Sequence, residues 1–379
     1  MACAGTTPPS WADLPEDLTR MVLCRLPAFV DHVRFAAVCP QWRAAARQHP
    51  VPRPMPLLAL PDGTFYSLPD GKPFRFPDSG YAGYKNATAD GSWLVFPRDD
   101  GCFLVDPLAG PTKTLPPLSS IPPSSQRSSY MPVLNKLIFC SPNLVAAFAG
   151  STMVQCGHNS QILVCQPGAS SWSVRANDKC KLFEDMAFYQ GQLYALADDE
   201  NLLIVNISQD PITGDPQVSQ IGQVITAGDP FHTGTNTMVK KKLYLVESHG
   251  ALLMARRKVF CRMAAGERVV AELEQTEFEV FAADLEHSQW VHVKTLGDDQ
   301  MLFLGRPCSR AVSASQHGMQ RDQIFFLDDV MENAFQGYAF EEENTCVGVY
   351  DMGTGKVSSP LPMVWKDDMI LATWLFPWE

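Results

Sequence analysis

The segment DMAFYQGQLYALADDENLLIVNI, residues 185–207, shows most directly how this chain folds. Its apolar residues alternate with polar ones or stand in short blocks, which is typical of β-strands. Gln190-Gly191 and Asp198-Asp199-Glu200-Asn201 interrupt this pattern with residues that favour tight turns. The segment therefore predicts consecutive antiparallel strands joined by two turns.

Comparable segments recur on both sides of it, at intervals of roughly 40 to 55 residues, the period expected of propeller blades. Each combines apolar strands with polar turns, and such a unit buries its apolar face only by stacking against its neighbours around a ring. The units cover residues 56–71, 92–118, 136–174, 185–207, 241–298 and 323–362. They predict a mainly β fold containing a six-bladed β-propeller, with seven blades as the alternative count.

The C-terminal sequence WLFPW, residues 374–378, is apolar and follows the last unit. An unpaired edge strand is a liability that closed β architectures remove. We therefore expect this segment to pair near residues 55–60 as the strand that closes the ring.

The composition argues against nucleic acid as a partner. The chain carries a net charge of −11, of which residues 11–50 contribute five Arg against four acidic residues, and residues 1–10 carry no charged side chain. The remaining residues, 51–379, therefore carry −12. Because proteins that bind phosphate backbones need clustered Lys and Arg, we expect no nucleic-acid partner.

The eleven Cys are an odd number without a CxxC pair, which is typical of reduced thiols packed in a core. The opening MACAGTTPPS, residues 1–10, lacks the basic and apolar parts of a secretory signal, and no apolar run is long enough to span a bilayer. We expect an intracellular protein, in the nucleus, the cytoplasm or both, with no membrane partner. Residues 1–10 are expected to be a disordered N-terminus.

Residues 11–50 have a different texture, because their apolar residues follow helical spacing. Pro15 and Pro40 occupy positions typical of the first turn of a helix, whereas Pro27 and Pro50 mark helix ends. The pattern predicts three short helices. A unit this small buries little surface and usually needs a partner for stability.

The sequence WADLPEDLTRMVLCRLPAFVDHVRFAAVCPQWRAAA, residues 11–46, resembles an F-box, whose pattern is a Leu-Pro opening, an apolar helix, a Leu-containing stop and a later Val-Cys-x-x-Trp-Arg. The resemblance implies docking of a Skp-type adaptor and, through it, a cullin. It assigns adaptor binding to nine residues: Leu14, Pro15, Leu18, Val22, Leu26, Val38, Cys39, Trp42 and Arg43. Pro40 departs from the family pattern, which more often has a basic or polar residue there.

The alternative for the same segment is an ordinary three-helix cap, in which the Leu, Val and Trp side chains are simply core. For any single residue this interpretation is as good as adaptor contact, but it explains the whole spaced pattern less well.

Residues 55–378 resemble the KIB-type β-propeller, a former plant domain of unknown function often found behind an F-box. The segments that carry the resemblance are FEDMAFYQGQLYALADDENLLIVNI, KLYLVESHGALLMARRKV, FEVFAADLEHSQWVHVKTLGDDQMLFLG and QIFFLDD. It implies a plant protein with an F-box at residues 11–50 and a KIB-type propeller at residues 51–379. It also implies target binding by the propeller without identifying the target.

Motifs for catalysis are missing from the sequence: it contains no GxSxG, HExxH or GxxxxGK[ST], and no GxGxxG between a strand and a helix. Of the eight His, only His287 and His292 lie close together, and their odd separation predicts opposite faces of a strand. Acidic doublets such as Asp198-Asp199 and Asp298-Asp299 stand at strand ends and indicate turns. We expect no catalytic residue, no metal site and no cofactor.

Two basic runs, Lys240-Lys241-Lys242 and Arg256-Arg257-Lys258, flank one predicted hairpin. They indicate a solvated hairpin face, with ubiquitin acceptors or a local basic rim as alternatives.

These observations favour a non-catalytic substrate-recognition subunit of an SCF-type cullin ubiquitin ligase, in which the F-box docks the adaptor and the propeller holds an unknown protein target. Two alternatives stay open: a scaffold that binds the adaptor without promoting degradation, and a propeller that binds a ligand and carries a vestigial F-box. The sequence does not separate the first alternative from a ligase subunit.

Overall fold

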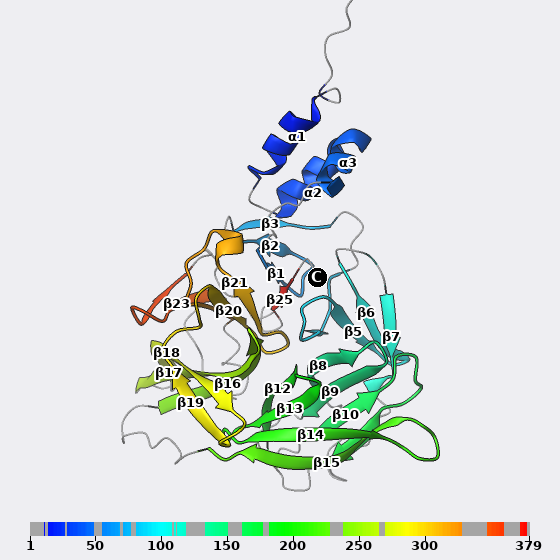
Figure 1. Ribbon diagram of the computed structural model, residues 1–379, viewed down its shortest axis with the longest axis vertical. Helices are drawn as coiled ribbons and strands as arrows, with labels where there is room; N and C mark the ends of the chain where they lie inside the picture. Colours follow the sequence, from blue (N-terminus) through cyan, green and yellow to red (C-terminus); the bar gives the residue numbers. More distant parts are fainter. Residues whose placement is uncertain are drawn as a thin grey trace, which may run out of the picture.

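The computed structural model describes residues 11, 14–26, 29–48, 55–68, 71–76, 81–107, 110, 112–118, 133–150, 161–176, 182–227, 238–264, 270–327, 347–359 and 372–376. Residues 1–10, predicted to be a disordered N-terminus, lie outside the described residues. Three helices precede a ring of six β-sheets (Figure 1). The helices are α1 (Glu16–Leu23), α2 (Phe29–Val38) and α3 (Pro40–Gln48).

Each sheet is one blade of a propeller, and blades 2 to 5 each contain four consecutive antiparallel strands. Blade 1 joins β25 (Thr373–Leu375), β1 (Leu57–Ala59), β2 (Phe65–Ser67) and β3 (Lys72–Phe74). Blade 2 joins β4 (Asn86–Ala87), β5 (Leu94–Arg98), β6 (Gly101–Val105) and β7 (Thr112–Leu115). Blade 3 joins β8 (Val133–Ser141), β9 (Leu144–Gly150), β10 (Gln161–Cys165) and β11 (Ser173–Ala176).

The longest strands of the ring lie in blades 4 and 5. Blade 4 joins β12 (Phe183–Tyr189), β13 (Gln192–Ala197), β14 (Leu202–Gln209) and β15 (Pro216–Ile225). Blade 5 joins β16 (Met238–Ser248), β17 (Ala251–Ala264), β18 (Val270–Asp284) and β19 (Gln289–Val293). Blade 6 contains β20 (Gln300–Leu304), β21 (Arg310–Ser313), β22 (Gln323–Leu327), β23 (Val347–Asp351) and β24 (Lys356–Ser358), with the short 3-10 helix η3 (Ser315–His317) after β21.

The predicted count of six blades is confirmed, and the segment that opened the sequence argument forms β12, β13 and β14 of blade 4. Gln190 and Gly191 both have positive φ, 47° and 78°, which is the backbone that a tight hairpin turn requires. Glu200 also has positive φ, in the second predicted turn. The turn chemistry read from the sequence therefore matches the observed turns.

Six apolar clusters hold the ring together, one at each junction between neighbouring blades. The last junction depends on the C-terminus, because β25 pairs with β1 in antiparallel register, Trp374 opposite Leu58. The Trp374 side chain is fully buried, and its Nε1 donates a hydrogen bond to the carbonyl oxygen of Leu304 at 3.0 Å. The prediction of a closing strand is therefore confirmed.

Blade 6 departs from the repeat. It has five strands, in the order β21, β20, β22, β23 and β24, and β20 and β22 run parallel. The turn after β20 carries Arg306, whose Nη2 donates a hydrogen bond to Oδ1 of Asn135 in blade 3 at 2.6 Å. Blades 3 and 6 are three places apart in a ring of six, so this contact crosses the centre of the ring. Cys308, in the same turn, is fully buried.

A buried ion pair ties together the first strands of three blades. Nζ of Lys136 in β8 lies 2.5 Å from Oδ1 of Asp185 in β12, and both side chains are almost completely buried. Oδ2 of Asp185 accepts a hydrogen bond from the backbone N–H of Leu245 in β16 at 2.8 Å. The full partnering of Asp185 is what a buried carboxylate requires.

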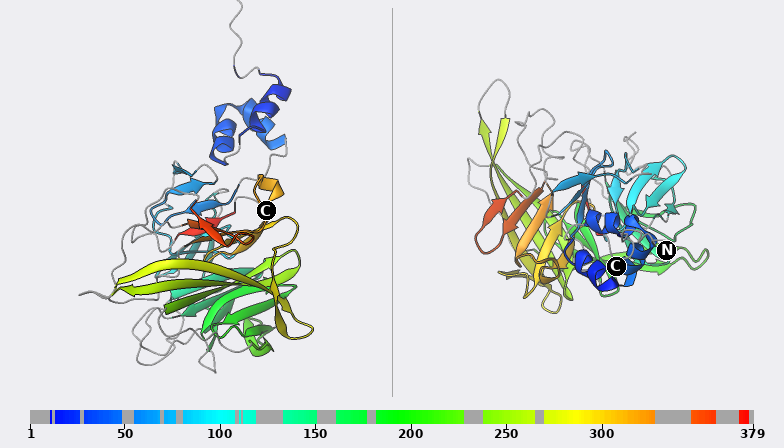
Figure 2. Two further views of the ribbon diagram at one scale, coloured as in Figure 1. Left: turned by 90° about the vertical axis from the view of Figure 1, so that its left-hand side faces the viewer. Right: turned by 90° about the horizontal axis from the view of Figure 1, so that it is seen from above.

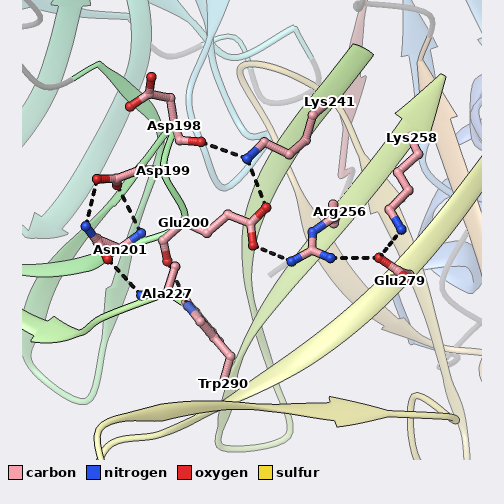
Figure 3. Close-up of polar contacts among 10 residues, drawn as sticks. All are labelled: Asp198, Asp199, Glu200, Asn201, Ala227, Lys241, Arg256, Lys258, Glu279 and Trp290. Atoms are coloured by element: carbon pink, nitrogen blue, oxygen red, sulfur yellow. Dashed lines mark hydrogen bonds and ion pairs between the residues drawn. The ribbon is translucent and has the colours of Figure 1, made fainter. Parts of the chain in front are cut away.

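The basic run Arg256-Arg257-Lys258 of β17 connects blade 5 to both neighbours, and Figure 3 shows its contacts on the side of blade 4. Arg256 pairs with Glu200 of blade 4 and with Glu279 of β18, and Lys258 also pairs with Glu279. Arg257 points the other way, where it is 1% exposed and donates a hydrogen bond to the carbonyl oxygen of Leu327 in blade 6. The interpretation of this run as a solvated face is wrong, because successive residues of a strand face the two adjacent blades.

Candidate functional site

The candidate site is the helical segment, residues 11–48, which Figure 1 shows outside the ring and beside blade 1. Helix α1 starts after Pro15, with Glu16 and Asp17 in its first turn, where acidic side chains suit the helix dipole. Arg25, just beyond its last turn, donates a hydrogen bond to the carbonyl oxygen of Met21 at 2.9 Å. The predicted three-helix arrangement is therefore present.

The core of this segment is small. Among the side chains of this segment that the structure describes, the buried ones are Thr19 and Leu23 of α1, Phe35 of α2 and Ala45 of α3. Trp42 is half-buried and packs its ring against Phe35, with 4.5 Å between the ring centroids. Four buried side chains give little stability to a unit of this size.

The nine residues assigned to adaptor binding fall into two groups. Leu18, Val22 and Val38 are exposed apolar side chains, and Pro15 and Arg43 are also exposed. Leu14, Leu26, Cys39 and Trp42 are half-buried and belong in part to the core of the segment. Five residues of the motif are thus exposed, and four belong in part to the core beneath them. Adaptor contact stays a prediction for each residue.

Two residues of the motif have internal partners. Nε1 of Trp42 donates a hydrogen bond to the carbonyl oxygen of Trp11 at 3.1 Å. Nε of Arg43 donates a hydrogen bond to the carbonyl oxygen of Ala36 at 3.1 Å. These bonds fix the junction of α2 with α3 and hold Trp11 against α3.

Three further large apolar side chains of the helical segment are exposed: Trp11, Met21 and Val33. Met21 lies three residues after Leu18 on α1, so helical spacing places the two side chains on one face. Trp11 is 76% exposed. Their apolar character in a helical pattern was visible in the sequence, but only the structure shows that these side chains are left uncovered.

Large apolar side chains that are exposed to solvent are unevenly distributed along the chain. In the part of the chain that the structure describes, the large apolar side chains exposed to solvent are Trp11, Leu18, Met21, Val22, Val33, Val38, Ile212, Val291 and Val357. Six of these nine lie in the helical segment. Exposed apolar patches of this kind mark interaction surfaces, whereas single exposed apolar residues are ordinary.

The propeller offers no comparable chemical site. Among the described residues no group of three His, Cys, Asp or Glu is placed to hold a metal ion. His287 contacts Asp284, with 2.9 Å between Nδ1 and Oδ2, while the ring of His292 packs edge-on against Phe281. The two close His therefore have separate partners, and they form no shared site.

The buried Cys are not nucleophiles. Burial raises the pKa of Cys102 to about 11 and the pKa values of Cys140 and Cys165 to about 12. These thiols stay protonated at neutral pH, and reactive Cys need the thiolate form.

In the described part of the chain, no helix is long and apolar enough to cross a membrane.

Asp199 and Asp299, from two of the acidic doublets, act in turns, as the sequence indicates; the doublets at 328–329 and 367–368 lie outside the described residues. Oδ1 and Oδ2 of Asp299 accept hydrogen bonds from Ser313 and Ser315, which lower the pKa of Asp299. Asp199 accepts hydrogen bonds from the backbone and side chain of Asn201. These carboxylates organise loops and have no geometry for acid–base chemistry.

Two family models match the chain, one for each region. The model described as the F-box domain matches residues 11–53, and the model described as the KIB1-4 β-propeller matches residues 65–351. The chain is similar to the F-box protein At2g26160 of Arabidopsis thaliana, with 23% identity over 360 residues that cover 86% of this chain and 98% of that protein. It is also similar to the probable F-box protein At1g65740 of the same plant, with 22% identity, covering 86% of this chain and 92% of that protein.

Solved structures are more distant. A mutant of the Synechocystis apocarotenoid oxygenase aligns with a TM-score of 0.29 and 12% identity, covering 72% of this chain and 58% of that one. An aldose sugar dehydrogenase from Streptomyces coelicolor aligns with a TM-score of 0.25 and 14% identity, covering 50% of this chain and 59% of that one. Scores this low give no basis for transferring an activity.

Proposed function

Since this chain belongs to the KIB1-4 β-propeller family and carries an F-box domain before its propeller, we propose that it is the substrate-recognition subunit of an SCF-type cullin ubiquitin ligase. The F-box docks a Skp-type adaptor, and the adaptor connects it to the cullin. The propeller binds a protein target, whose lysines then come within reach of a ubiquitin-charged enzyme. The chain itself supplies no catalytic group.

The observation that carries this proposal is the exposed apolar surface of the helical segment. A small unit with four buried side chains presents six large apolar ones to solvent. Covering that surface with a partner removes it from water, which contributes roughly 25 cal/mol for each Å² of apolar surface. Docking and folding of the helical segment therefore support each other.

The mechanism is one of effective concentration. Holding two partners in one assembly converts their encounter from a bimolecular event into an intramolecular one. The negative charge of residues 51–379 favours a basic or mixed target whose association slows as salt screens the attraction. Such an assembly operates in the nucleus or the cytoplasm, which is where we place this protein.

The test is a pair of charge substitutions on the exposed face of α1, Leu18→Lys and Val22→Lys. Both side chains are exposed, so folding should be little affected. Loss of a central interface anchor costs about 2 to 4 kcal/mol, roughly thirty-fold to nearly a thousand-fold in affinity. We expect the doubly substituted full chain to lose adaptor and cullin in pull-downs while it keeps partners of the propeller.

Ile212→Lys is the matched control, because Ile212 is 92% exposed but lies in the turn between β14 and β15 of blade 4. It should leave adaptor capture unchanged. The change of Leu14 and Pro15 to Ala tests the opening of the motif in the same assay. If the Leu18 and Val22 variant captured the adaptor at the wild-type level, the ligase proposal would be wrong.

Separate assays distinguish a ligase subunit from a non-degradative scaffold. The half-life of a captured target is compared in cells that express the wild type or the Leu18 and Val22 variant. A ligase subunit shortens the half-life only when its adaptor surface is intact. A scaffold leaves the half-life the same in both cases.

A further inference from the structure

The central strands of blade 5 extend past the strand that follows them. Figure 2 shows β17 and β18 running out beyond the rest of the ring. β19 pairs with β18 only from Val280, opposite Val293, to Asp284, opposite Gln289. Among the described residues, no strand pairs with this edge of β18 over residues 270–279.

Within this open edge, the uninterrupted part is residues 275–279. The register between β17 and β18 shifts next to Gln275, so that Glu274 has no direct opposite residue on β17. Such a bulge bends a strand and limits regular pairing beyond it. Over residues 275–279 the outer edge of β18 offers backbone groups that an added strand can bind, except at Phe278, whose backbone N–H is hydrogen-bonded to the side chain of Tyr350 in β23.

Side chains of this stretch alternate between two faces. Thr276 and Phe278 are buried toward blade 6, and the ring of Phe278 lies 5.3 Å from that of Tyr350 in β23. Gln275, Glu277 and Glu279 lie on the other face and are at least partly exposed. An added strand would meet an apolar neighbour on one face and carboxylates on the other.

Blade 6 leaves an apolar side chain uncovered at the same place. Val357 of β24 is directly opposite Tyr350 of β23, and opposite residues of antiparallel strands share a face. Val357 therefore points toward blade 5, yet it is 47% exposed, whereas Tyr350 is buried. Blade 6 has a fifth strand here, whereas β19 of blade 5 pairs only with residues 280–284 of β18, and in the described part of the chain no strand of blade 5 covers Val357.

We infer that the edge notch, formed by residues 275–279 of β18 and Val357 of β24, binds an extended segment of the target as an added strand of blade 5. The bound segment alternates apolar and basic residues. Its apolar side chains cover Val357, and its Lys or Arg side chains lie beside Glu277. This inference rests on the proposed function only for the statement that the peptide belongs to a ubiquitination target.

A second copy of this chain fits the notch poorly. Two β18 edges that pair about a two-fold axis would bring the Glu277 side chains of both copies together, and like charges on neighbouring strands are destabilising. The net charge of −12 on residues 51–379 adds to that repulsion. A basic strand from another protein has the complementary charge.

The probe is a short fluorescent peptide that alternates lysine and valine, titrated with the full chain while anisotropy is measured. Val357→Lys and Glu277→Lys should each weaken binding about tenfold, because each replaces a favourable neighbour by a repulsive one. Both positions are at the surface, so the thermal transition should not change. Ile212→Lys, which adds the same charge on blade 4, is the matched control and should leave binding as in the wild type.

Backbone pairing is tested separately with two N-methylated peptides, each methylated on one alternate set of amides. Only one set faces β18, so one peptide should lose binding and the other should keep it. Equal binding of both peptides, or equal loss in all three Lys variants, would show general attraction of a basic peptide to an acidic protein and would overturn the inference.

Analytical sedimentation of the same variants tests the alternative occupant of the notch, which is a second copy of this chain. A dimer of the wild type that Val357→Lys dissociates, without peptide binding, would assign the notch to a second copy and overturn the inference. Adaptor capture is unaffected by either notch variant if the two surfaces are separate. Failure of peptide binding with intact adaptor capture therefore contradicts this inference alone and leaves the proposed function standing.

Discussion

The helical segment and the propeller place their large apolar side chains differently. Among the described side chains of the helical segment, six large apolar ones are exposed and two, Leu23 and Phe35, are buried, whereas each junction between blades of the propeller encloses an apolar cluster. Two Trp residues show the difference: Trp11 is 76% exposed, and Trp374 is fully buried. A ring can close on itself and a forty-residue helical unit cannot, so the proposed adaptor would cover apolar surface that the helical segment cannot bury by itself.

The largest expected effect comes from opening the ring. Trp374→Ala removes a fully buried side chain at the junction of blades 1 and 6, and such changes cost about 3 to 5 kcal/mol. This approaches the whole stability of a typical domain, about 5 to 15 kcal/mol. Thermal unfolding followed by circular dichroism should show a large loss of stability or aggregation. Deleting residues 373–379 should have a still larger effect.

Trp11→Ala is the matched control, because the same residue type is removed where it is exposed. It should leave the unfolding transition of the propeller unchanged. If both Trp variants unfolded at the wild-type temperature, burial of Trp374 would not be what stabilises the closed ring.

The next effect concerns the polar interior of the ring. Asp185→Ala leaves the ammonium group of Lys136 buried without its partner, and breaking a buried ion pair in this way costs about 3 to 5 kcal/mol. Urea denaturation should show this loss. The double change Asp185→Leu, Lys136→Met should be considerably more stable than Asp185→Ala, because no buried charge remains unpaired. A double variant less stable than the single one would contradict the role assigned to the pair.

The smallest effect concerns the ion-pair network between blades 4 and 5 (Figure 3). Burial alone would raise the pKa of Glu279, but the hydrogen bonds and charges of Lys258 and Arg256 outweigh it and lower the pKa below the usual 4.5. The folded protein therefore binds fewer protons than the unfolded chain in this range. The stability that Glu279 contributes is present above about pH 4.5 and is lost as the pH falls through the folded-state pKa.

Glu279→Gln removes this titration. Its stability should be lower than that of the wild type at pH 6, and the difference should shrink as the pH falls below 4.5. Urea midpoints of both proteins at several pH values measure it. The Glu279 side chain is 32% exposed, and the partial access of solvent to these pairs keeps the effect small. A difference that grew at lower pH would have the wrong sign.

Much of the architecture was predictable because it depends on residues close together in the sequence. Hairpin turns such as Gln190-Gly191 require particular φ values, and alternation of apolar residues places one face of each strand inward. Repetition of these local units predicts a ring, and an apolar C-terminus predicts its closing strand. The F-box pattern also lies within one short segment, so the resemblance to the family could assign adaptor binding to its nine positions, and that assignment stays a prediction.

What the sequence left open depends on contacts between distant residues. The run Arg256-Arg257-Lys258 looked like a solvated face, but its partners Glu200 and Leu327 come from blades 4 and 6. The fifth strand of blade 6, the contact of Arg306 with Asn135 and the uncovered Val357 likewise follow from which blades meet in the ring. The sequence by itself thus determined the strands, turns, helices and their repetition, because these depend on propensity and periodicity over a few residues. Only the tertiary structure decided which charges are buried, which edge stays open and which apolar side chains face solvent, because burial is set by neighbours far away in the chain.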